Sequence, residues 1–244
     1  MRIFASNLND RPHFLFWCHP RAKRPVYRDL EECGAIVQRC SFQTSALVFP
    51  SIDQDLMEPG ELNAYIAYSN VDSAEEDALV EWRCYRNGEF RYRANFWELG
   101  DVYSQQRMLH NTVYVPNADD PKCPGLINLV TLAYRVTAAH VFAERLLRCF
   151  SATVDEVKAG LAGIAGYGLG RLDQSQSFPR APIARENGSI FCSTAEDLRN
   201  GYDPYVLAGE ALVVLYRHFG WETKPSQLRN LLDDVREIAE RPES

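Results

Sequence analysis

The sequence predicts an α+β fold, a mostly antiparallel sheet with a central long helix and two C-terminal helices packed on it. Strand-like runs fill the first hundred residues, and Asn87-Gly88 joins two alternating strands in residues 78–97, a strong hairpin signal. Residues 126–150 are apolar nearly all round at helical spacing. With 244 residues and 46% apolar content, we expect a single domain, 1–244, with a possible sub-boundary in 98–125.

The N-terminal half reads mainly as strands. HFLFWC (13–18) predicts a buried strand that ends at His19-Pro20, and Pro25 suits the first turn of a following helix. SALVFP (45–50) predicts a second strand, a polar loop covers 51–60, and ELNAYIAYS (61–69) leads through an acidic turn to the hairpin.

The C-terminal half reads mainly as helices. Because the 126–150 helix is apolar on nearly every side, it must be central and covered. VDEVKAGLAGIAGYGLG (154–170) predicts a strand that runs into a glycine-rich bend, and a short strand is expected at SIFC (189–192). Asp203-Pro204 predicts the start of a helix and Gly220 its end. A last amphipathic helix is expected at about 226–240. Trp221 and the apolar stripe that begins at Leu228 can pack either on the core or against a partner.

Charge and cysteine usage narrow the classes of function. A net charge of −7 argues against a generic nucleic-acid binder, although a local basic patch remains possible. The seven cysteines are odd in number and include no Cys-x-x-Cys, which indicates reduced thiols and a cytoplasmic protein. Neither a signal peptide nor a membrane span is predicted.

The hairpin is the main candidate site. A two-residue turn would place Arg83, Tyr85, Phe90 and Tyr92 on one face, and Trp82, Cys84, Arg91 and Arg93 on the other. Aromatic rings offer stacking surfaces and arginines offer phosphate contacts, the combination used for single-stranded nucleic acid. The alternative is one buried face and one solvated face on which arginines lie over aromatic rings.

A second basic cluster, Arg21, Lys23, Arg24 and Arg28, follows the first strand. If that strand neighbours the hairpin, the two groups could form one patch; otherwise the cluster is a solvated face. The predicted nucleic-acid-binding residues are Arg83, Arg91, Arg93, Tyr92, Arg21, Lys23 and Arg24.

No catalytic residue, metal site or cofactor site is predicted. The glycines at 163, 166, 168 and 170 lack phosphate-loop spacing, and we expect them to allow turns or close backbone approach. Asp155, Glu156 and Lys158 match the acid-and-lysine pattern of metal-dependent nucleases only in three residues. Cys18 and His19 are adjacent on a strand and should point to opposite faces.

Residues 12–172 contain four elements in a distinctive order: FLFWCHPRAKRP, the hairpin WRCYRNGEF, a long apolar helix and LAGIAGYGLGRL. This order resembles the accessory region that follows Schlafen/Alba-type DNA-binding domains in bacterial proteins. Residues 1–244 do not show the glutamate-and-lysine opening or the glycine-rich strand turn of the DNA-binding module. The resemblance implies an accessory or sensing module of a prokaryotic regulatory or defence system. We therefore expect a non-catalytic binding, scaffolding or sensing subunit that acts through a protein partner, a second copy of itself or nucleic acid; the alternatives are a metal-dependent nuclease and a small-molecule sensor.

Overall fold

The computed structural model describes residues 12–21, 29–43, 48–50, 57–59, 64–70, 79–96, 126–150, 153–170, 184–193 and 203–224, together with 226, 228, 229, 232, 233 and 236. Within these residues the chain forms one large sheet, two small ones and three helices. None of the helices in these ranges is long and apolar enough to cross a bilayer.

The large sheet has seven strands, and each neighbouring pair is antiparallel. Its order is β11 (Gly188–Ser193), β9 (Thr153–Ala162), β1 (His13–Arg21), β7 (Phe90–Asn95), β6 (Leu79–Tyr85), β5 (Ala64–Asn70) and β4 (Met57–Pro59). The small sheets are an antiparallel pair, β2 (Phe42–Gln43) with β3 (Val48–Phe49), and a parallel pair, β8 (Leu126–Asn128) with β10 (Gly168–Gly170). The α+β prediction is confirmed.

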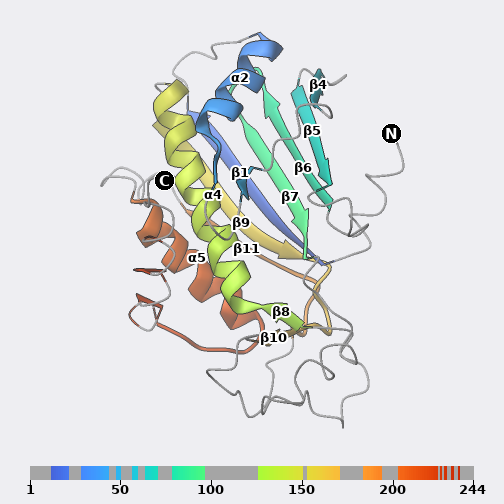
Figure 1. Ribbon diagram of the computed structural model, residues 1–244. Helices are drawn as coiled ribbons and strands as arrows, with labels where there is room; N and C mark the ends of the chain where they lie inside the picture. The colour runs from blue at the N-terminus through green and yellow to red at the C-terminus, as the bar shows by residue number, and fades with distance from the viewer. Residues whose placement is uncertain are drawn as a thin grey trace.

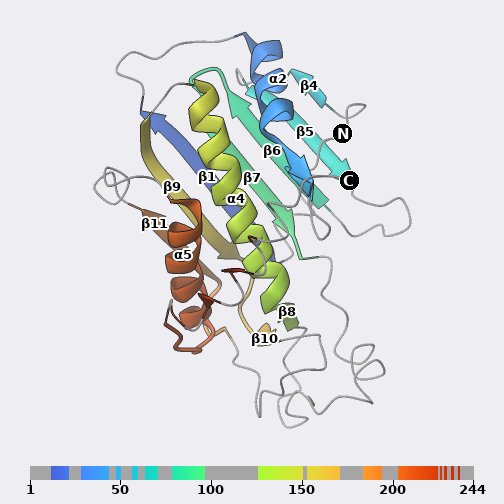
Figure 2. The same ribbon diagram turned by 60° about the vertical axis from the view of Figure 1, so that its left-hand side comes forward.

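All three described helices lie on one face of the large sheet (Figure 1). They are α2 (Leu30–Cys40), α4 (Leu129–Phe150) and α5 (Pro204–His218). α2 packs over β5 and β6, and α5 packs over β9 and β11, with α4 running between them (Figure 2). The central long helix is therefore confirmed. The second C-terminal helix expected at 226–240 lies largely outside the described residues.

The core fills the space between the sheet and the helices. Alternate residues of the central strands point into it, among them Phe14 and Phe16 of β1, Trp82 of β6 and Phe90 of β7, all with no exposed surface. Phe142 of α4 lies with its ring centroid 4.6 Å from that of Phe90. These large apolar side chains supply most of the stabilisation expected from burial.

Local sequence sets the helix ends. The Asp203 side chain accepts hydrogen bonds from the backbone N–H groups of Tyr205 and Val206, so the predicted start of α5 is confirmed. Gly220, with a φ of +80°, follows the end of α5 as expected. α2 begins at Leu30, with Asp29 as its N-cap, whereas Pro25, expected in the first turn of a helix, lies outside the described residues.

Two predicted boundaries were wrong by a few residues. β1 continues past His19-Pro20 to Arg21, because a register shift between those two residues lets a proline sit within the strand. Residues 126–128 form β8, so α4 begins at Leu129; the Asn128 side chain accepts a hydrogen bond from the backbone N–H of Val130.

The glycine-rich bend after β9 turns the chain sharply. Gly163 and Gly166 have positive φ values of 70° and 84°, and the chain then enters β10, which pairs with β8. This is the backbone role that the sequence predicts for these glycines.

The predicted hairpin register was wrong by one residue. The Gly88 N–H donates to the Tyr85 carbonyl, and the Tyr85 N–H donates to the Glu89 carbonyl, so the loop contains three residues and not two. Gly88 takes a φ of +84°, the geometry of a turn followed by a bulge. A one-residue slip exchanges the faces of one strand relative to the other. Cys84 therefore pairs with Phe90, Trp82 with Tyr92, and Arg83 with Arg91.

Candidate nucleic-acid interface

The corrected register places the hairpin arginines together on the face opposite the helices. Arg91 and Arg93 alternate with the buried Phe90 and Tyr92 along β7, and Arg83 lies directly across from Arg91. We call this side of the sheet the open face. Its described side chains on the five strands from β11 to β6 are Ile190, Cys192, Glu156, Lys158, Ala162, His13, Leu15, Trp17, His19, Arg91, Arg93, Asn95, Glu81, Arg83 and Tyr85.

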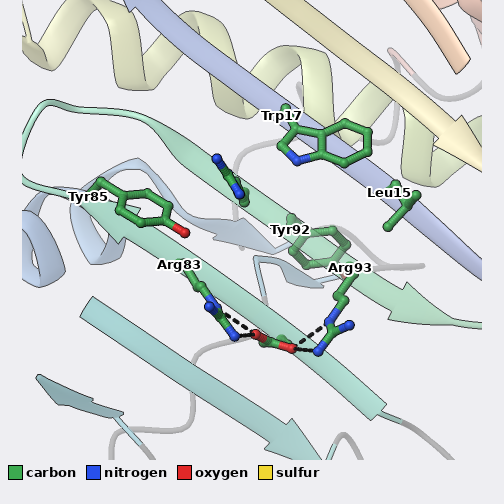
Figure 3. A pocket seen from close by; sticks show the side chains of 8 residues that line it. Leu15, Trp17, Arg83, Tyr85, Tyr92 and Arg93 are labelled. Carbon is green, nitrogen blue, oxygen red and sulfur yellow. Dashed lines mark hydrogen bonds and ion pairs between the residues drawn. The ribbon is translucent and has the colours of Figure 1, made fainter. Parts of the chain in front are cut away.

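A shallow depression of about 280 Å³ lies in the open face (Figure 3). Leu15 and Trp17 of β1 border one side, and Arg83 and Tyr85 of β6 border the other. Arg91 and Arg93 of β7 lie between them. Trp17 is the cross-strand partner of Arg91, and Leu15 of Arg93, so antiparallel pairing holds the aromatic and apolar groups beside the cations.

Arg83 and Arg93 point toward one another and meet at the carboxylate of Glu81 (Figure 3). Both Nε and Nη2 of Arg83 contact Oε1 of Glu81, at 2.7 and 2.6 Å, while Arg93 contacts Oε2. Partial burial lowers the pKa of the Arg83 guanidinium, but the charge and hydrogen bond of Glu81 outweigh it and hold the pKa above its ordinary value. Only 4% of the Glu81 side chain is exposed, against 27% for Arg83 and 22% for Arg93.

Arg91 is the most accessible of the three arginines. Its side chain is 51% exposed, its Nε lies 2.6 Å from Oε1 of Glu89, and its guanidinium lies over the Tyr85 ring at 5.2 Å. His19 contacts the other oxygen of Glu89 at 3.6 Å. A guanidinium stacked on a ring keeps donors directed outward, so this pair can receive both a planar group and an anion.

The acid-and-lysine pattern of β9 forms an ion pair on the same face. Lys158 Nζ lies 2.7 Å from Glu156 Oε2, and the Cys192 thiol donates to Oε1 of Glu156 at 2.9 Å. These two hydrogen bonds hold the pKa of Glu156 below its ordinary value. The described residues contain no group of three His, Cys, Asp or Glu side chains placed to hold a metal ion. Cys18 is buried and His19 exposed, on opposite faces as predicted.

The structure places only some of the predicted nucleic-acid-binding residues on the open face. Arg83, Arg91 and Arg93 come together on the open face. Tyr92 borders the same depression, but it is 4% exposed and its ring packs against Phe49 in the helix-covered core. Lys23 and Arg24 lie outside the described residues, as does the side chain of Arg21, whose backbone ends β1.

Sequence reasoning missed Trp17, Leu15 and Glu81. A signal for the charged part was present, because Glu81-Trp82-Arg83, Glu89-Phe90-Arg91 and Glu156-Val157-Lys158 all place an acid and a base two residues apart in or beside strands. Residues i and i+2 of a strand share a face. In the structure each of the three motifs closes as an ion pair on the open face.

The described ion-paired groups of the open face carry a small positive excess. They are four cations, Arg83, Arg91, Arg93 and Lys158, and three carboxylates, Glu81, Glu89 and Glu156, which leaves 4 − 3 = +1. The whole sequence carries −7. Positive charge is therefore concentrated where the aromatic side chains lie.

Comparison with protein-family models, with curated proteins and with solved structures finds no match for the chain.

Proposed function

We propose that the chain is a non-catalytic binding module that holds single-stranded nucleic acid on the open face. The proposal is supported by one observation above all: three guanidinium groups and the rings of Trp17 and Tyr85 gather at one depression in that face. Bases stack on aromatic rings whatever their identity, and guanidinium groups contact the phosphates between them.

The shape of the site favours single strands over duplex. Reading a duplex takes an element that projects into a groove, such as a helix or a two-stranded ribbon. The open face is the side of a sheet, with its aromatic and basic side chains on three adjacent strands, which suits unstacked bases laid across it. The resemblance to the accessory region of Schlafen/Alba-type proteins fits this role in a bacterial regulatory or defence system, in the cytoplasm.

Fluorescence anisotropy with a labelled 12-nucleotide single strand tests the proposal. With about three phosphate contacts, the affinity should fall about 20-fold between 50 and 200 mM NaCl. Arg91→Ala should weaken binding and reduce the salt slope by about 0.7. Trp17→Ala should weaken binding by about 5- to 150-fold, as expected for the loss of one stacked base at about 1–3 kcal/mol.

Arg148→Ala is the matched control. Arg148 also pairs with a glutamate, Glu144 at 2.5 Å, but it lies on α4, on the helix-covered side of the sheet. Its replacement should leave the affinity unchanged. Absence of binding at 50 mM NaCl, or an equal loss in Arg148→Ala, would refute the proposal. A third result would also refute it: the wild type binds no oligonucleotide, and Trp17→Ala loses a protein partner that the wild type binds. That result would assign the open face to protein recognition.

A further inference from the structure

Two cysteines from distant parts of the chain meet where α2 and α4 end. Cys40 is the last residue of α2, and Cys149 is the last but one of α4. Their Sγ atoms lie 3.3 Å apart, although 109 positions separate them in the sequence. The two helices pack against each other, with the C-terminal, yellow end of α4 beside α2 (Figure 1).

This pair differs in access from the other described thiols. Cys40 is 1% exposed, but Cys149 is only partly buried, so Cys149 is the member of the pair nearer to solvent. Cys33 and Cys84 also interact, but both have no exposed surface. Cys192 is exposed, and its thiol donates to the Glu156 carboxylate and not to a second thiol.

Reaction of Cys149 removes part of what holds the proton on the Cys40 thiol. Burial, together with the hydrogen bond and charge of Cys149, raises the pKa of Cys40 to about 12, against the lowering effect of Arg39 and Arg145. A Cys149 sulfur that has been converted to a disulfide carries no charge. The contribution from the Cys149 charge is then lost, while burial still raises the pKa of Cys40 and the two arginines still lower it.

We propose that Cys40 and Cys149 form a reversible dithiol–disulfide site that ties α2 to α4, with glutathione disulfide as the oxidant. The Cys149 thiolate attacks one sulfur of glutathione disulfide and expels one glutathione thiolate, which leaves a mixed disulfide. The Cys40 thiolate then attacks Sγ of Cys149 and expels the second glutathione. The two protein thiols lose two electrons and two protons, and the oxidant becomes two glutathione thiols.

The site is independent of the proposed nucleic-acid binding. Cys40 and Cys149 lie on the helices, and the sheet separates them from the open face. Closing a loop of about 110 residues removes conformational freedom from the unfolded chain. Oxidation should therefore raise the melting temperature by several degrees, up to about 10 °C, and leave oligonucleotide affinity unchanged.

The test uses the full chain equilibrated in mixtures of reduced and oxidised glutathione. Non-reducing peptide mapping should recover the peptide that links Cys40 to Cys149, and the melting temperature should rise with the linked fraction. Cys149→Ser should lose both effects. Cys192→Ser, which removes the exposed thiol on the other face, should keep both. A mixed disulfide that stays on Cys149, a link that joins other cysteines, or an equal temperature rise in Cys149→Ser would overturn the proposal.

Discussion

Glu81→Gln should lower stability and raise nucleic-acid affinity at the same time. In the wild type the Glu81 carboxylate holds Arg83 and Arg93, and a bound phosphate must share or displace these contacts. Glutamine keeps the size of the side chain and removes the charge. The formal charge of the described ion-paired groups on the open face then rises from +1 to +2, because their three carboxylates become two.

The loss of stability follows from the burial of the ion-paired groups. Removing one partner of a fully buried ion pair costs about 3–5 kcal/mol. Here the carboxylate is 4% exposed but the two guanidinium groups are 27% and 22% exposed, so water solvates part of the charge left behind. We therefore expect the free energy of unfolding to fall by about 2 kcal/mol.

The gain in affinity follows from the charge that is removed. A carboxylate about 6 Å from a phosphate repels it by about 0.7 kcal/mol at the dielectric constant of water, and by about 2.8 kcal/mol at an effective value of 20. The affinity should thus rise at least about threefold.

Urea unfolding and oligonucleotide anisotropy on the same samples measure both effects. Glu144→Gln is the control, because it removes a carboxylate paired with Arg148 on the helix side and should change neither quantity by more than about 0.5 kcal/mol. If the affinity of Glu81→Gln falls, or stays equal to that of the wild type, the open face does not bind an anion through Arg83 and Arg93, and the reasoning fails.

Two further predictions test the core and the hairpin. Burial lowers the pKa of His140 from 6.5 to about 4, against the raising effect of its hydrogen bond with the Val136 carbonyl. On acidification the His140 imidazole is therefore protonated in the unfolded chain before it is protonated in the folded chain. His140 should therefore lower the free energy of unfolding by about 2 kcal/mol between pH 7.5 and 5. Urea unfolding of His140→Leu should show a pH dependence that is weaker by this amount. An equal pH dependence in the two proteins would contradict the lowered pKa of His140. Gly88→Ala should lower the free energy of unfolding by about 1–2 kcal/mol in the same assay, because Gly88 has a φ of +84°. An unchanged free energy of unfolding would argue against the three-residue loop.

The sequence predicts most elements because their signals are local. Asp203-Pro204 carries both the N-cap and the first-turn proline of α5, and the apolar periodicity of 126–150 requires a covered helix. The hairpin register was wrong because Asn87-Gly88 suits a two-residue turn as well as the loop seen here, in which Asn87 Oδ1 accepts from the Glu89 N–H.

The site depends on that register and on long-range pairing. With the two-residue turn, Arg83 falls on the opposite face from Arg91 and Arg93; with the observed loop, all three share one face. Trp17 joins them only because β1 pairs with β7, some 70 positions later in the chain, and no local pattern around Trp17 specifies that partner. The contact of Glu81 with Arg93 depends on the register alone, because the two residues are cross-strand partners in the hairpin, and its contact with Arg83 lies within β6.

The central position of β1 has a consequence for how the protein is made. Its neighbours are β7 and β9, and His13 pairs with Ala162, so the first described strand waits for partners encoded far downstream. At about 5–20 residues per second, roughly 10 to 30 s pass between synthesis of β1 and of the end of β9. During that interval the apolar HFLFWC segment leaves the ribosome without its sheet partners, which makes it the natural target for a chaperone on the nascent chain.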